Sequence, residues 1–181
     1  MEVQVEVKNP YAVDFEKYNK ILFQEISLEW PANAKDYQPG EQIKEFFLED
    51  LPKTIEKKIE TWNQPPDSTE EIPPNSVLIT GKLTLEIKER SKIKEVKDET
   101  GKPKNVFTAV QHWDLAMSVT MKETDTGKEI FKQEFTEKLS NVDSSETTTK
   151  FNFETIFFKI TNRLTLKLRK TKEVQRRYIM H

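Results

Sequence analysis

The stretch SVLITGKLTLEIKERSK, residues 76–92, alternates apolar and polar side chains for longer than most strands last. One side of this stretch carries Val77, Ile79, Gly81, Leu83, Leu85 and Ile87. The other side carries mainly lysine, threonine and glutamate. Such alternation is typical of an antiparallel strand with one face on a core and the other in water. The fold must therefore include a sheet with one covered face, and Gly81 on that face predicts a close approach, a bend or a bulge.

Two further strands follow in the sequence. The second strand places apolar side chains on one face from Phe107 to Met121, and the third spans residues 128–139. The segment Thr124-Asp125-Thr126-Gly127 predicts a tight turn between them, with Gly127 suited to the left-handed position. Together the three strands predict a meander.

Helical periodicity appears on both sides of the meander. Residues 38–62 carry an apolar stripe at intervals of three and four, and Pro52 within it predicts a kink or two shorter helices. Helix-start residues at 143–146 precede a second stripe over residues 151–170, although Leu164, Leu166 and Leu168 also alternate as in a strand. Residues 18–28 predict a buried first strand.

This order predicts an α+β fold: strand, helix, three-strand meander, helix, with a twisted, mostly antiparallel sheet and two helices packed on one face. We expect one domain over residues 18–170. Residues 1–17 form a short strand or a tether, and residues 171–181 form a basic tail that frays or docks loosely.

Composition excludes several classes of function. The 29 basic and 31 acidic residues leave a net charge of −2, so no nucleic-acid partner is expected. The absence of cysteine excludes disulfides and thiolate chemistry. Four glycines cannot build a glycine-rich phosphate loop around Gly81. With only His112 and the terminal His181, we expect no catalytic residue, no metal site and no cofactor. A hydrolase with paired carboxylates between sheet and helices, or a nucleic-acid-binding adaptor, stays an alternative.

The aromatic residues suggest a binding surface instead. Phe151 and Phe158 lie seven residues apart in the last predicted helix and off its main apolar stripe. Either this helix has a wide apolar face, or the two rings form a ridge that binds a partner or a lipid.

The segments LITG (Leu78 to Gly81) and DTGKEIF (Asp125 to Phe131), in this order of strands and helices, resemble the periplasmic domains of bacterial outer-membrane lipoproteins. The similar types are the curli-secretion and penicillin-binding-protein-activator lipoproteins, and the lipopolysaccharide-assembly lipoprotein. The resemblance implies a non-enzymatic envelope module that binds an envelope protein or an amphipathic ligand. It implies a periplasmic location, with membrane association only through a lipid anchor that this cysteine-free sequence does not contain. A cytoplasmic location stays open.

Overall fold

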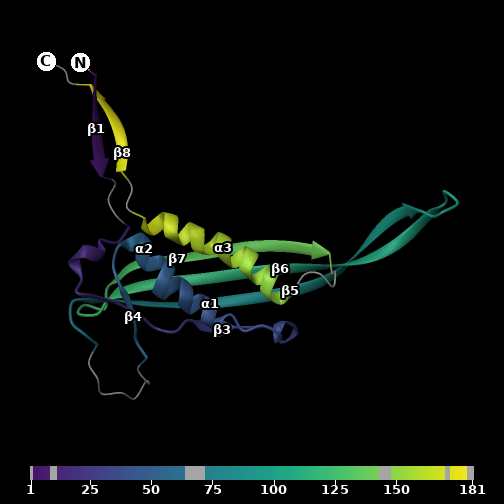
Figure 1. Ribbon diagram of the computed structural model, residues 1–181, viewed down its shortest axis with the longest axis horizontal. Coiled ribbons are helices and arrows are strands. Elements are labelled where there is room, and N and C mark those ends of the chain that lie inside the picture. The colour runs from purple at the N-terminus through teal and green to yellow at the C-terminus, as the bar shows by residue number, and fades with distance from the viewer. Residues whose placement is uncertain (1, 9–11, 64–71, 143–147, 170–171, 179–181) are drawn as a thin grey trace.

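An open, twisted six-stranded sheet forms the centre of the molecule, and helices cover one of its faces (Figure 1). The structure is a computed structural model that describes residues 2–8, 12–63, 72–142, 148–169 and 172–178. The strands of the sheet are β2 (Lys20–Phe23), β3 (Ser27–Glu29), β4 (Ile59–Thr61), β5 (Ser76–Lys97), β6 (Pro103–Glu123) and β7 (Glu129–Val142). Their order is β4-β2-β5-β6-β7, with β3 also paired to β5. The two long ladders, β5–β6 and β6–β7, are antiparallel, so the predicted α+β class is confirmed.

The ladder between β5 and β6 runs without a register shift from Val77 opposite Glu123 to Lys97 opposite Pro103. Side chains of alternate residues therefore stay on the same side along both strands. In the centre of the sheet this inner side is buried against the helices, with Ile79, Leu83 and Met117 fully inaccessible to solvent. Burial of each such side chain contributes roughly 1.5–3 kcal/mol.

Gly81 lies on the inner side of β5, as expected from the alternation. A Cβ at this position would clash with the backbone carbonyl oxygen of Ser118 on β6, and it would meet the side chain of Ile26. The absent side chain thus makes room for the neighbouring strand and for Ile26, rather than for a helix. Ile26 lies between β2 and β3, where the pairing with β5 shifts by one residue. The single strand predicted over residues 18–28 is therefore two short strands.

The first helical region is shorter and less regular than predicted. It consists of α1 (Gly40–Glu45), a π-helical turn (Phe46–Asp50) and α2 (Leu51–Ile55). Pro52 lies in the first turn of α2, directly after the π-helical turn, where its missing N–H breaks the regular hydrogen-bond ladder. The prediction that this helix continues to residue 62 is wrong. The chain turns at Glu56, whose φ is +55°, and β4 then pairs in parallel with β2.

The last helix, α3 (Thr149–Leu168), is continuous and packs on the inner side of the sheet (Figure 1). Its N-cap is Thr148, whose hydroxyl accepts a hydrogen bond from the N–H of Phe151. The predicted helix-start residues 143–146 lie outside the described residues. The buried side of α3 includes Phe153 and Phe157, whose stacked rings have their centroids 5.0 Å apart. Phe157 also meets Phe46 of the π-helical turn, with ring centroids 6.1 Å apart.

The two ends of the chain pair with each other. β1 (Glu2–Lys8) and β8 (Lys172–Tyr178) form a two-stranded antiparallel ribbon beside the main body (Figure 1). The N-terminal segment, for which a short strand or a tether was predicted, thus contains a strand. The basic tail, for which no strand was predicted, becomes its partner because two extended segments satisfy each other's backbone groups.

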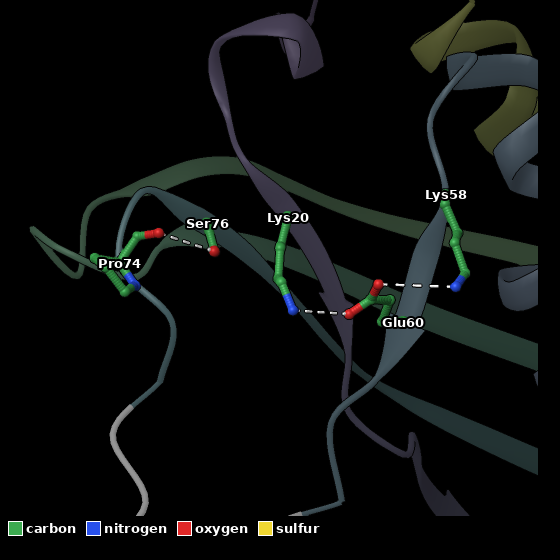
Figure 2. A network of polar contacts seen from close by, with 5 residues as sticks. All are labelled: Lys20, Lys58, Glu60, Pro74 and Ser76. Atoms are coloured by element: carbon green, nitrogen blue, oxygen red, sulfur yellow. Dashed lines mark hydrogen bonds and ion pairs between the residues drawn. The ribbon is translucent and has the colours of Figure 1, made fainter.

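Figure 2 shows polar contacts in the part of the sheet where β4, β2 and β5 lie side by side. The carboxylate of Glu60 contacts Lys20 Nζ at 3.2 Å and Lys58 Nζ at 3.8 Å. The hydroxyl of Ser76, which is fully buried, donates a hydrogen bond of 3.2 Å to the carbonyl oxygen of Pro74. This bond satisfies the buried hydroxyl at the start of the long strand β5.

Candidate functional site

The outer side of α3 carries three exposed apolar side chains, Phe151, Phe158 and Leu166, with 57 %, 64 % and 64 % of their surfaces accessible. They are separated by seven and eight residues, which is about two helical turns each time, so they lie on one side of the helix, within about 80° of one another around its axis. We call this row the α3 stripe. The structure thus brings the two sequence-predicted binding residues, Phe151 and Phe158, to one surface and adds Leu166 to it.

The helix that presents the α3 stripe is held firmly on the sheet. The guanidinium of Arg163 contacts the carboxylate of Glu137 on β7 at 2.6 Å and lies 5.6 Å from the ring centre of Phe135. The hydroxyl of Thr149 donates a hydrogen bond of 2.8 Å to Asp36, and Asn141 is hydrogen-bonded to the buried Asn152. Because α3 is anchored along its whole length, a partner would meet the stripe on a rigid support, which limits the entropy lost on binding.

A second exposed apolar surface lies at the far end of the β5–β6 ladder. The last pair between β6 and β7 is Val110 with Val142, and beyond it residues 91–97 and 103–109 form a two-stranded extension (Figure 1). We call this extension the arm. Ile93 and Phe107 lie opposite each other on it, with 59 % and 71 % of their surfaces accessible.

The two faces of the arm differ in charge. The face of Ile93 and Phe107 continues the inner side of the sheet, because the register is unbroken. Its charged residues are Glu89 at the base, Glu95 beside Ile93, and Lys97 at the tip. The opposite face carries only cations among its charged residues: Arg90, Lys92, Lys94 and Lys104. One face of the arm therefore has Glu95 beside Ile93 and Phe107, whereas the other face is basic around the exposed Val96 and Val106.

The outer, helix-free face of the sheet has a shallow hollow of about 380 Å³ that includes Glu86 and Asp114. These two carboxylates face each other across the β5–β6 ladder, but Lys88 contacts Glu86 at 2.8 Å and Lys138 contacts Asp114 at 3.4 Å. This pair lies on the face opposite the helices and not between the sheet and the helices, where the hydrolase alternative places its carboxylates, and each member is paired with a lysine.

Histidine and metal chemistry find little support on this face. His112 Nδ1 lies 2.8 Å from the hydroxyl of Ser140, but no carboxylate among the described residues is hydrogen-bonded to its imidazole. The neighbouring backbone N–H groups belong to the strand ladders, so they offer no oxyanion hole. No group of three potential metal ligands occurs in the described ranges of the chain.

Carboxyl groups with a displaced pKa act as hydrogen-bond acceptors. The pKa of Glu29 lies below its ordinary value because Lys82 and Thr84 donate to it, and the pKa of Asp98 is lowered by the hydroxyl of Thr100 and the N–H of Lys102. The pKa of Glu123 is lowered by the hydroxyls of Tyr18 and Thr126. None of these three is held protonated, as a general acid would need to be.

The other residues singled out from the sequence lie away from both apolar surfaces. Gly127 has a φ of +67° in the turn between β6 and β7, and Pro52 lies in α2. Sequence reasoning missed Leu166, although its spacing of eight from Phe158 is visible. It also missed the arm, because the apolar side predicted for the first long strand ends at Ile87 and leaves out Ile93.

The fold and these surfaces define an α+β module in which the described helices cover one side of the sheet. No helix in the described part of the chain combines the length and apolarity needed to cross a bilayer. No protein-family model matches the sequence, and no curated protein matches it closely.

Among solved structures, the chain is similar in fold to a neuraminyllactose-binding hemagglutinin homolog from Helicobacter pylori. The TM-score is 0.55 at 11 % identity, over 90 % of this chain and 88 % of that chain. The PelC dodecamer from Paraburkholderia phytofirmans overlaps with a TM-score of 0.43 at 8 % identity, over 94 % and 100 % of the two chains. Lipoprotein GNA1162 from Neisseria meningitidis overlaps with 0.32 at 11 % identity, over 79 % and 98 %. The first likeness supports a shared fold, whereas the other two are too loose to support an argument.

Proposed function

We propose that this chain is a non-catalytic binding module of a bacterial cell envelope that holds a partner protein against the α3 stripe. The observation that carries the proposal is the row Phe151, Phe158 and Leu166 on a helix whose opposite side is fully packed. Several exposed apolar side chains on one side of a rigid element, surrounded by polar residues, are typical of protein-binding surfaces. The lipoprotein-like motifs at residues 78–81 and 125–131 support the envelope location.

Site-specific photocrosslinking in the cell tests the binding surface. A photoreactive amino acid at position 158 should give one discrete protein adduct, identified by mass spectrometry. The matched control is position 138, because Lys138 is also highly exposed but lies on the outer sheet face. The adduct should disappear when Phe151→Asp and Leu166→Asp are introduced. Identical adducts from both positions, or lipid adducts alone from position 158, would contradict the proposal.

The genomic reading frame tests the location. A signal peptide followed by a lipobox cysteine upstream of residue 1 would support an envelope lipoprotein. A continuous reading frame without a signal peptide would argue against the envelope, while leaving the binding surface to be judged by the crosslinking.

A further inference from the structure

Two exposed surfaces, the α3 stripe and the face of the arm that carries Ile93 and Phe107, hold the five most exposed large apolar side chains of the described residues. Both are narrow: the α3 stripe is a single row along a helix, and the arm offers the cross-strand pair Ile93 and Phe107. Within one molecule they cannot meet by simple packing, because the arm continues the body strands and extends beyond α3 and β7 (Figure 1). They can meet only between molecules.

The arm also lacks the cover that the same face has elsewhere. Along the centre of the ladder, the inner side of β5 and β6 is covered by helices, and Ile79 is fully buried there. On the arm the same alternation continues without any helix above it. A helix from outside the molecule would complete on the arm the layer arrangement that the body already has.

The charges of α3 and of the arm support the idea that a helix like α3 covers this face of the arm. Residues 149–169 contain five cations and one carboxylate, Glu154, which is paired with Lys150 at 3.7 Å. Lys159 follows Phe158 of the stripe and has no carboxylate partner among the residues that the structure describes. On the apolar face of the arm, Glu95 is two residues from Ile93 and has no cation partner in the same set. Glu95 beside Ile93 would thus meet Lys159 beside the α3 stripe.

We propose that the apolar face of the arm packs on the α3 stripe of a second copy of this chain. The inference rests on the proposed function, since it names the partner of the same surface. Each copy offers one arm and one stripe, which are different surfaces, so the contact is head-to-tail. Such contacts continue from copy to copy until a ring closes or an open chain forms.

Sedimentation velocity of the purified chain over a range of concentrations tests the contact. The unmodified chain should associate, and Glu95→Lys or Lys159→Glu alone should weaken association at least about tenfold, because each places like charges together. The combined Glu95→Lys and Lys159→Glu chain should regain association. The matched control is Lys94→Glu, which adjoins Glu95 but lies on the opposite face of the arm and should change little. Circular dichroism of each variant confirms that these exposed substitutions leave the fold intact.

A chain that stays monomeric at all concentrations would overturn the inference, as would a combined variant that associates no better than the single ones. An equal effect of Lys94→Glu would also overturn it, because the basic face would then be the one in contact. A monomeric chain that still gives a discrete adduct with another protein from position 158 would overturn only the self-association. If the chain is monomeric and position 158 also gives no discrete protein adduct, the proposed function is overturned as well.

Discussion

The same two strands, β5 and β6, form both the most buried and the most exposed parts of the sheet. Ile79 and Ile93 lie on the same side of β5, yet Ile79 is inaccessible to solvent and 59 % of the Ile93 surface is accessible. The register does not change between them. Alternation therefore fixes which side chains of a strand share a face, but these side chains are buried only where another element of structure packs on that face.

The two ends of the β5–β6 ladder are also held differently. At the end near the turn into β7, Tyr18 donates a 2.7 Å hydrogen bond to Glu123, and Asp125 accepts one from the N–H of Asn75 at 2.8 Å. At the tip of the arm, Asp98 accepts hydrogen bonds from Thr100 and Lys102, both within four residues of it. One end is joined to distant parts of the chain, whereas the other is held only by its own turn.

Truncating Ile79 and Ile93 to alanine should give the largest difference between the body and the arm in the free energy of unfolding. Ile79→Ala leaves a cavity in a packed core and should lower the free energy of unfolding by about 2–5 kcal/mol. Ile93→Ala removes atoms that solvent already reaches, so the loss should be below about 0.5 kcal/mol. Urea unfolding of both variants at a concentration where the chain is monomeric measures the difference. Similar losses would mean that the arm is covered within a single molecule.

Adding one methyl group to the β5–β6 ladder at Gly81 should have the next largest effect on stability. Gly81→Ala would place its Cβ against the carbonyl oxygen of Ser118, so β5 and β6 must move apart, at about 1–3 kcal/mol. A Cβ added to Gly40, at the start of α1, would have no neighbouring atom within 4 Å, and Gly40→Ala should leave stability unchanged or raise it by up to about 1 kcal/mol. Thermal unfolding of both variants distinguishes a crowded strand from an open helix start. A neutral Gly81→Ala would show that the two strands have room to separate.

The sequence predicted the sheet and its class because alternation is a local property. The inner side of β5 follows directly from residues 77–87, and the buried apolar side of α3, which packs on the sheet, follows from helical spacing. The end of the first helix could not be predicted in the same way. Ile59 continues the helical stripe, and only the long-range pairing of β4 with β2 shows that it belongs to a strand. Tertiary pairing overrides local periodicity at this point.

The candidate surface was predictable only in part. Phe151 and Phe158 stood out because they lie off the main stripe of their helix. Ile93 and Phe107 belong to the correct face by alternation, but whether a face is covered depends on where the helices end in space. No local pattern contains that information, which is why the arm is visible only in the structure.

Loosening the arm should change its dynamics but not the stability of the body. The cross-strand pair of Ile93 and Phe107 contributes about 0.2–1 kcal/mol, so Phe107→Ala should raise amide exchange on the arm by at most about fivefold. Amides of residues 113–121 should exchange as before, because their opening requires unfolding of the core. Hydrogen exchange by mass spectrometry measures both regions in one sample. The matched control is Val106→Ala on the other face, and faster exchange in the body with Phe107→Ala would show that arm and body open together.

The smallest expected difference concerns the carboxylates at the two ends of the ladder. Both Glu123 and Asp98 have a pKa below its ordinary value, so above the ordinary carboxyl range of about 4 Glu123 stabilises the folded body and Asp98 stabilises the turn at the tip of the arm. Each contribution is lost as the pH falls through the lowered pKa. Burial and the hydrogen bond to Glu123 also raise the pKa of Tyr18 to about 12, in agreement with a shared contact. Glu123→Gln should therefore lower the unfolding temperature at pH 7 by at most about 2 °C, and the difference should vanish near pH 2. Asp98→Asn should leave the unfolding temperature unchanged at both pH values, because the tip of the arm opens before the body unfolds. Equal responses of the two variants would show that the tip is as tightly coupled to the body as the end near Tyr18.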